Sequence, residues 1–284
     1  MSTLLAGRAA VVVGGTRGIG LAVAELLAAE GASVVLNGRD ADTTEQAAER
    51  VSGLGIPGSP ADPAVADALI EACVQAHGRI DILVNCAGTA EPAGSSILNV
   101  TSAQFRELLD AHLLTAFETC RAAAPHMVRQ GCGAIVNTSS FAFLGDYGGT
   151  GYPAGKGGVN GLTLAIAAEL REHGVRANVV CPGARTRLSE GAEYERHIAE
   201  LNRRGLLDDV SAQGALDAAP PRYVAPTYGY LVSDLAKEVT GRIFIAAGGF
   251  IGEFTRPETG FIGYRDHKDT PPYAIEDVQR LIGG

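Results

Sequence analysis

The sequence predicts an α/β fold in which one doubly wound parallel sheet of about seven strands is covered by helices on both faces. Short β-branched runs such as AAVVV (9–13), ASVVLN (32–37) and IDILVN (80–85) alternate with longer Ala- and Leu-rich segments of helical period. This alternation is typical of a parallel sheet wrapped by helices. The runs are apolar throughout, as expected for strands buried on both faces.

Length and spacing predict one domain over residues 1–284, since doubly wound folds often reach this size as a single unit. Further strands are expected at GAIVNTSS (133–140), RANVVC (176–181) and GRIFIAA (241–247). A polar segment at about 189–219 and a C-terminal extension at about 250–284 interrupt the alternation. Either could be a lid, a specificity loop or an oligomer contact.

The composition favours a small-molecule substrate. The formal net charge is −9 and the chain has no basic run, which argues against binding of nucleic acid or of an anionic membrane surface. The five cysteines form no C-x-x-C pair and no His/Cys grouping, so we expect reduced thiols and no metal site. The apolar start is broken by Arg8, and no later run approaches about 20 apolar residues, which predicts a soluble cytoplasmic protein.

The turn after the first strand predicts a dinucleotide site. In VVVGGTRGIGLAVAELLAAEG (11–31), Gly14, Gly18 and Gly20 lie between a buried strand and a helix that begins near residue 18. Glycines here let the backbone approach a pyrophosphate, whose charge is bound by the free N–H groups at the helix start. A tight turn without a ligand would use the same residues, but the strand-turn-helix context favours a cofactor.

The end of the second strand favours NADP over NAD. An acidic residue at this place would bind the adenosine 2′-hydroxyl of NAD, but the sequence here is LNGRD (36–40). Arg39, assisted by Arg17 and by the Asn37 amide, offers donors that suit the extra phosphate of NADP. The alternative is that Arg39 is only a solvated residue after a strand and that Asp40 binds the ribose.

A serine, a tyrosine and a lysine in SSFAFLGDYGGTGYPAGK (139–156) predict acid/base chemistry. Tyr152 and Lys156 are four residues apart, so they project from one face of a helix. An ammonium a few Å away would lower the phenol's pKa by about two to three pKa units from its usual ~10, and a positively charged nicotinamide would lower it further. Ser140, at the end of its strand, would hold the substrate oxygen. Each part alone is common by chance, but the three together after the glycine turn are not.

These motifs resemble the short-chain dehydrogenase/reductase family from about Arg8 to Ala247. GGTRGIG, PADPA, NCAG, VNTSS, YPAGK and CPGART stand in the family's order and at nearly its spacing, which implies a Rossmann-type fold. The resemblance implies that Ser140, Tyr152 and Lys156 form the catalytic group, with Lys156 also on the nicotinamide ribose. The cofactor-binding residues expected from these motifs and from the arginines above are Gly14, Thr16, Arg17, Gly18, Ile19, Gly20, Asn37, Arg39, Asp62, Asn85, Ala87, Gly88, Tyr152, Lys156, Pro182, Gly183 and Thr186.

The sequence departs from the family pattern at three places. His112, in LLDAHLLTAF, stands at the position of the family's usual catalytic asparagine. It either joins a proton relay, being titratable near neutral pH, or is only packed between helices. Val13 replaces the threonine that usually precedes the first motif glycine. The distance along the chain from Ser140 to Tyr152 is one residue shorter than in the family, which leaves Ser139 as the alternative to Ser140.

The C-terminal third carries a narrower resemblance. The stretch APPRYVAPTYGYLVSDLAKEVTGRIFIAAGGFIGEF (219–254) and the tail after it resemble the hydroxyacyl-CoA dehydrogenase units of peroxisomal multifunctional β-oxidation enzymes. Arg39 and the longer segment at 189–219 depart from that pattern.

We therefore expect an NADP(H)-dependent ketoreductase or secondary alcohol dehydrogenase with Tyr152 as general acid/base. Two alternatives stay open: a dehydratase or epimerase that acts through a transient ketone, and a cofactor-binding regulator without chemistry. The presence of both Tyr152 and Lys156 favours an enzyme. The helix at 151–173 carries Gly155, Gly157, Gly158 and Gly161, each destabilising it by up to ~1 kcal/mol relative to alanine. Packing against the sheet or between subunits would compensate, and the resemblance implies a homodimer or homotetramer.

Overall fold

Eight strands form one sheet in the computed structural model, which describes residues 3–92, 94–147 and 149–283. Their order is β3-β2-β1-β4-β5-β6-β7-β8, and every neighbouring pair is parallel except β7 and β8. The strands are β1 (Ala9–Val13), β2 (Ser33–Gly38), β3 (Leu54–Pro57), β4 (Ile82–Asn85), β5 (Gly133–Thr138), β6 (Val175–Gly183), β7 (Ile243–Ala247) and β8 (Phe250–Phe254). The predicted doubly wound parallel sheet is confirmed, and β8 adds an antiparallel strand at its edge.

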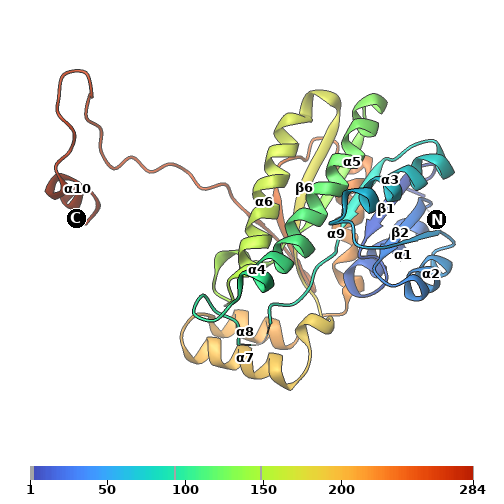
Figure 1. The fold of residues 1–284 in the computed structure, drawn as a ribbon, viewed down its shortest axis with the longest axis horizontal. Helices are drawn as coiled ribbons and strands as arrows, with labels where there is room; N and C mark the ends of the chain where they lie inside the picture. The colour runs from blue at the N-terminus through green and yellow to red at the C-terminus, as the bar shows by residue number, and fades with distance from the viewer. Residues whose placement is uncertain (1–2, 93, 148, 284) are drawn as a thin grey trace. The chain divides into compact units, whose positions relative to one another are not determined.

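Helices cover both faces of this sheet. They are α1 (Gly18–Ala29), α2 (Ala41–Arg50), α3 (Pro63–His77), α4 (Ser102–Leu109), α5 (Thr115–Gln130), α6 (Gly151–Glu169), α7 (Ala192–Arg203), α8 (Asp209–Leu216), α9 (Ala225–Val232) and α10 (Ile275–Ile282). On one face α1 packs against α9, and on the other α3 packs against α5 (Figure 1). Strand β1 serves both layers, because Val12 packs in the cluster that holds Leu27 of α1, whereas Val11 packs with Leu69 of α3. This is why the strand is apolar at every position.

The sheet order places a binding edge at the carboxyl ends of the strands. The chain proceeds from β1 through β2 to β3 in one direction and then returns to place β4 on the other side of β1. In open α/β sheets, ligands bind outside the carboxyl ends of the strands at such a reversal. The turn after β1 and the segment after β4 both lie there, as the glycine motif and NCAG require.

The segment predicted at 189–219 is a helical pair with a small core of its own. Helices α7 and α8 bury Ile198, Leu201, Leu207 and Ala212 together. Tyr147, which precedes α6, packs on the edge of this core, and its carbonyl oxygen lies 2.9 Å from His197 Nε2 of α7. The helical pair is therefore fastened to the chain immediately before α6.

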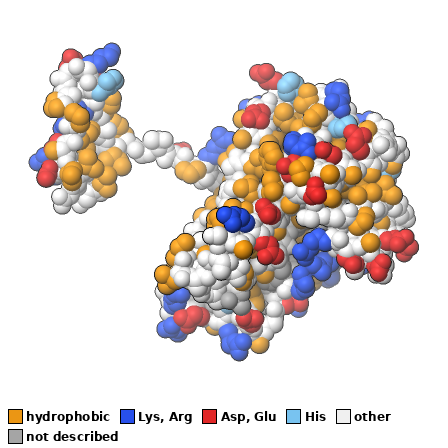
Figure 2. Space-filling view, in the orientation of Figure 1, with side chains coloured by type: hydrophobic (Ala, Val, Ile, Leu, Met, Phe, Trp, Pro, Cys, Tyr) orange, Lys and Arg blue, Asp and Glu red, His pale blue; other side chains and the backbone are white. Residues whose placement is uncertain are grey.

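The predicted extension is divided between two units, Met1–Phe254 and Thr255–Gly284. Its first residues form β8, and the rest belongs to the second unit. Within that unit Arg265 pairs with Asp277 of α10 at 3.1 Å and stacks 4.0 Å above the ring of Tyr273. Apolar side chains remain on the visible surface of this unit (Figure 2). Within the described ranges, no helix combines the length and apolar character needed to cross a membrane.

Candidate active site

The turn between β1 and α1 can only be made by glycines. Gly14 and Gly18 have positive φ angles of 71° and 56°, a region that residues with a Cβ avoid. A Cβ on Gly14 would stand 2.7 Å from the Ala87 Cα, and one on Gly20 would stand 2.2 Å from the Gly14 carbonyl oxygen. The turn is thus packed directly against NCAG. No side chain caps α1 at Arg17, so the first amides of this described helix stay available to an anion.

Three arginines gather beside this turn. The pKa of Arg17 is lowered, first by burial and then by the positive charges of Arg187 and Arg39. Arg187 follows Thr186, whose methyl group would lie 3.7 Å from a Cβ on Gly18. Like charges held together in this way are stabilised by an anion between them. Arg187 was not predicted from the sequence. The available signal was that CPGART (181–186) is followed directly by this second arginine.

The Asn37 amide does not face this cluster. Its Nδ2 donates to the carbonyl oxygens of Ile56 at 2.9 Å and Gly58 at 3.1 Å, and the residue is 2% exposed. Asn37 therefore joins β2 to the end of β3, contrary to the expectation that its amide assists a phosphate. Asp40, the alternative ribose ligand, accepts a hydrogen bond from the Thr43 amide and so caps α2.

The Asn85 side chain is likewise used inside the protein. Its Nδ2 donates to Asn137 Oδ1 at 2.8 Å, and its Oδ1 accepts from Thr119 at 2.9 Å. This buried network links β4 to β5 and α5, so Asn85 shapes the edge of the sheet without offering its side chain to a ligand. Of the residues that follow it, Ala87 packs against Gly14, and Gly88 lies beside His112 and Lys156.

The remaining expected residues lie around the same edge. Asp62 caps α3 through the Ala64 amide at 2.9 Å, and Ile19 packs on the core. Thr16 covers Gly38, where a Cβ would lie 2.2 Å from its methyl carbon. Pro182 and Gly183 end β6 opposite Ala246 and Ala247 of β7.

Ser140 and Tyr152 lie together at the end of β5. A hydrogen bond from Ser140 acts to lower the pKa of Tyr152, but burial of the phenol is the larger effect and raises that pKa above its usual value. Ser139, the alternative, is 2% exposed, and its hydroxyl donates to the Lys156 carbonyl oxygen at 3.1 Å. The structure thus brings Ser140, and not Ser139, to the phenol.

Lys156 is buried beside them. Its Nζ donates to the Thr138 carbonyl oxygen at 2.9 Å and lies 5.7 Å from the centroid of the Tyr152 ring. Burial lowers the pKa of Lys156 to about 8. We predicted that this ammonium would lower the pKa of Tyr152, and for the protein groups alone that prediction is wrong, because burial raises this pKa and Lys156 is not among the groups that shift it.

His112 completes the group from a π-helical turn, Asp110–Leu114, that joins α4 to α5. Its Nε2 lies 3.0 Å from the Thr89 carbonyl oxygen, which accepts, so the ring proton is on Nε2 and Nδ1 is a bare acceptor. The Nδ1 atom is buried without a partner among the described residues. Burial and the charge of Lys156 lower the pKa of His112 to about 2. His112 is therefore buried, as one interpretation held, and its ring contacts Tyr152. The other interpretation, a relay that depends on titration near neutral pH, is contradicted by this pKa.

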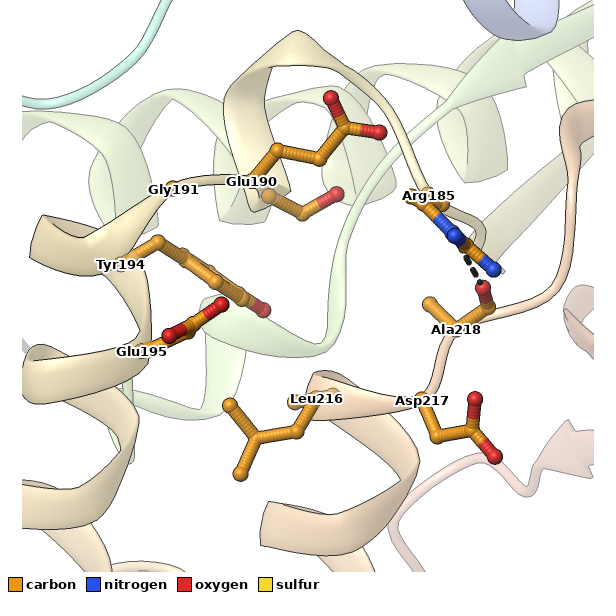
Figure 3. Close-up of a pocket in the computed structure, with 10 residues that line it drawn as sticks. Arg185, Glu190, Gly191, Tyr194, Glu195, Leu216, Asp217 and Ala218 are labelled. Carbon is orange, nitrogen blue, oxygen red and sulfur yellow. Dashed lines mark hydrogen bonds between the residues drawn. The ribbon is translucent and has the colours of Figure 1, made fainter.

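A pocket lies among residues 185–218 (Figure 3). Its volume is about 300 Å³, and it is formed by the segment at 189–219 together with Arg185. Glu190, Glu195 and Asp217 line it, whereas Arg185 turns its Nε to the Ala218 carbonyl oxygen at 3.3 Å. Tyr194, also in the lining, has its pKa raised to about 12 by burial and by Tyr147 and Tyr152.

Comparison with known proteins identifies the family. The family model described as short chain dehydrogenase matches residues 8–194. The chain belongs to the short-chain dehydrogenase/reductase family. This short-chain dehydrogenase is an oxidoreductase of a family that uses nicotinamide cofactors, and the glycine turn, the uncapped α1 and the arginine cluster fit such a dinucleotide. In the described part of the chain, no group of three or more His, Cys, Asp or Glu residues could hold a metal ion.

Individual relatives cover nearly the whole short-chain dehydrogenase. A 3alpha-hydroxysteroid dehydrogenase of Mediterraneibacter gnavus is 36% identical over 87% of this chain and 98% of its own length. An NADP-dependent (R)-specific alcohol dehydrogenase of Lentilactobacillus kefiri is 32% identical over 89% of this chain and 100% of its own. The crystal structure of a short chain dehydrogenase from Mycobacterium avium, 29% identical, superposes with a TM-score of 0.79 over 99% of this chain and 94% of that one. None of these is a hydroxyacyl-CoA dehydrogenase, so they lend no support to the narrower resemblance of the C-terminal third.

Proposed function

We propose that this short-chain dehydrogenase is an NADP(H)-dependent ketoreductase or secondary alcohol dehydrogenase. The observation that carries the proposal is the convergence of Ser140, Lys156 and Tyr152 at the end of β5, beside the glycine turn. A phenol beside a hydroxyl, with an ammonium 5.7 Å from the centre of the phenol ring, suits reversible proton transfer to a carbonyl oxygen.

Each side chain has one task in this scheme. Tyr152 donates its phenolic proton to the carbonyl oxygen as the alcohol forms and takes it back in the reverse direction. Ser140 holds that oxygen by a hydrogen bond. When bound, the nicotinamide supplies or accepts the hydride, and its positive oxidised form favours the phenolate of Tyr152. Lys156, with a pKa of about 8, can restore the proton near neutral pH.

In this proposal His112 is the hydrogen-bond acceptor for a water in the proton relay. Its bare Nδ1 would lie 2.9 Å from a Cβ on Gly88, and Lys156 Nζ would lie 3.7 Å from the same point. A buried acceptor without a partner destabilises the fold by about 1–3 kcal/mol. A water that lies between Lys156 and His112 and donates a hydrogen bond to Nδ1 would remove that cost. The water would then link Lys156 to a neutral imidazole, which accepts a hydrogen bond but takes up no proton, in place of the usual asparagine.

The arginine cluster supports NADP over NAD. The positive charges of Arg39 and Arg187 both act on Arg17, which favours a phosphate near these residues. Guanidinium forks bind phosphate in a bidentate manner. A relative's printed name, the NADP-dependent alcohol dehydrogenase, agrees with this choice.

The substrate proposed is a small ketone or secondary alcohol. We assign the substrate to the pocket formed by residues 185–218, whose three carboxylates disfavour anionic substrates such as acyl-CoA esters. Assay of a panel of neutral, cationic and anionic ketones with NADPH and with NADH, followed by cofactor absorbance, tests the proposal. We expect turnover of neutral or cationic ketones with NADPH. Absence of net cofactor oxidation with every ketone would overturn it and favour the dehydratase, epimerase or regulator alternatives.

A further inference from the structure

The Glu91 carboxylate caps the helix that carries Tyr152. Oε1 accepts hydrogen bonds from the amides of Thr150 at 3.2 Å and Gly151 at 3.3 Å, and Oε2 accepts from the amide of Tyr152 itself at 2.5 Å. Glu91 lies 61 residues earlier in the chain than Tyr152, in the connection between β4 and α4. A carboxylate at a helix start satisfies free amides and is attracted by the positive end of the helix dipole.

Helix α6 has no cap of its own at this end. Its N-cap residue, Thr150, makes no side-chain cap bond, and Pro153 in the first turn has no amide proton to offer. The next amide, that of Ala154, already donates to the Thr150 carbonyl oxygen. Among the described residues, Glu91 therefore accepts the hydrogen bonds of all the free backbone amides at the start of α6, those of Thr150, Gly151 and Tyr152.

Tyr152 depends on this cap more than Lys156 does. It lies in the first turn, where helices fray and where no earlier turn holds the backbone. Lys156 lies one turn further on, and its Nζ is bound to the Thr138 carbonyl oxygen. Loosening the helix start would thus move the phenol while leaving the ammonium in place.

The segment that carries Glu91 also holds His112. The Thr89 carbonyl oxygen accepts from His112 Nε2 at 3.0 Å, two residues before Glu91, and Ser95 donates to Glu91 Oε1 at 2.9 Å. The imidazole in turn packs on the Tyr152 ring. Residues 89–91 therefore contact both members of this aromatic pair, one through a carbonyl oxygen and one through a carboxylate.

We propose that Glu91 is a positioning residue for Tyr152, which fixes the first turn of α6 and thereby the phenol relative to Ser140 and His112. This inference rests on the proposed function, because it assumes that the phenol transfers the proton. Nothing in the sequence around Glu91 indicates the role, since the residues it binds are remote along the chain.

The test compares Glu91→Gln with Thr101→Ala. The amide of glutamine keeps the shape of the side chain but replaces one acceptor oxygen with a donor that faces backbone amides. Thr101 caps α4, which packs on α6, through the Gln104 amide at 3.2 Å. Its loss therefore removes a cap of the same kind without removing a hydrogen bond from α6. For each variant kcat, the KM of a ketone substrate, the Kd of NADPH and the midpoint of thermal unfolding are measured, together with amide hydrogen exchange of a peptide spanning residues 149–156.

We expect Glu91→Gln to lower kcat by about ten- to a hundredfold, while the Kd of NADPH stays within about twofold of wild type. Amide hydrogen exchange of the peptide at 149–156 should be faster in Glu91→Gln than in wild type. Thr101→Ala should lose thermal stability but keep kcat within about twofold. An unchanged kcat in Glu91→Gln, or equal losses of kcat in both variants, would overturn the inference.

Failure of the proposed function would look different. If wild-type protein turned over no ketone with either cofactor, the reaction assignment would be lost, but hydrogen exchange would still decide on Glu91. Faster exchange at 149–156 in Glu91→Gln but not in Thr101→Ala supports the cap as the element that holds Tyr152. Equal exchange in all three proteins rejects it.

Discussion

The His112 ring stands edge-on to the Tyr152 ring, with 4.7 Å between the centroids and 77° between the planes. The imidazole is neutral, because burial holds its pKa at about 2. A neutral ring in this position removes water from the phenol without adding a charge, and burial is the largest cause of the raised pKa of Tyr152. The pair thus keeps the phenol protonated until a positive charge approaches it.

Burial of His112 predicts how stability depends on pH. The folded-state pKa of about 2 lies below the usual ~6.5 of an unfolded chain, so the unfolded state binds more protons and stability falls as the pH drops below 6.5. Between pH 7 and pH 5 this histidine should remove about 2 kcal/mol from the free energy of unfolding. The variant His112→Asn should lack that loss. Urea unfolding of both proteins at the two pH values measures the difference, and equal pH dependence would show that His112 is protonated in the folded state.

Removal of the phenolic hydroxyl should stop the chemistry. In Tyr152→Phe the ring that packs on His112 is kept and only the proton donor is lost, so kcat should fall by at least about 10²–10⁴-fold. Binding of NADPH, measured by fluorescence titration, should change little. Turnover close to that of wild type would rule out Tyr152 as the acid/base, and loss of NADPH binding would show that the variant disturbs more than the chemistry.

The arginine cluster predicts a shift in cofactor choice. In Arg39→Asp a carboxylate replaces one of the guanidinium groups that act on Arg17, so the ratio of kcat/KM for NADPH to that for NADH should fall by on the order of 10–100-fold. The matched control is Arg50→Asp, which breaks an exposed ion pair with Glu25 on the same side of the sheet. An exposed pair contributes little, so this variant should keep the wild-type ratio. The same ratio in wild type and in Arg39→Asp would show that Arg39 does not bind the 2′-phosphate.

Much of the fold could be predicted because its signals are local. The apolar runs, the helical periods and the positive-φ glycines such as Gly14 each act within a few residues. The placement of Ser140 near Tyr152 followed from the same signals, since both lie at the carboxyl edge of the sheet.

The errors concern contacts that only tertiary packing decides. Asn37 has the donors that a phosphate needs, yet carbonyl oxygens at the end of β3 accept them. The Asn85 side chain is likewise bound inside the protein, by Asn137 and Thr119. The pKa of Tyr152 was expected to follow its attraction to Lys156, but the degree of burial cannot be read from residue spacing. Glu91 gave no signal at all, because its partners lie about 60 residues away.

The exposed face of α6 predicts self-association. Gly157 and Gly161 lie four residues apart on one side of this helix, and a Cβ at either would meet nothing within 4 Å. Small residues let a second backbone approach closely, and such packing would offset the low helix propensity of glycine. We therefore expect a homodimer or homotetramer in sedimentation experiments, whereas Gly161→Arg should sediment as a monomer of 29.3 kDa. Gly214→Arg, at an equally open glycine of α8, is the control and should keep the wild-type mass. A wild-type protein that sediments as a monomer would contradict the prediction, and an oligomeric Gly161→Arg would place the interface on another face.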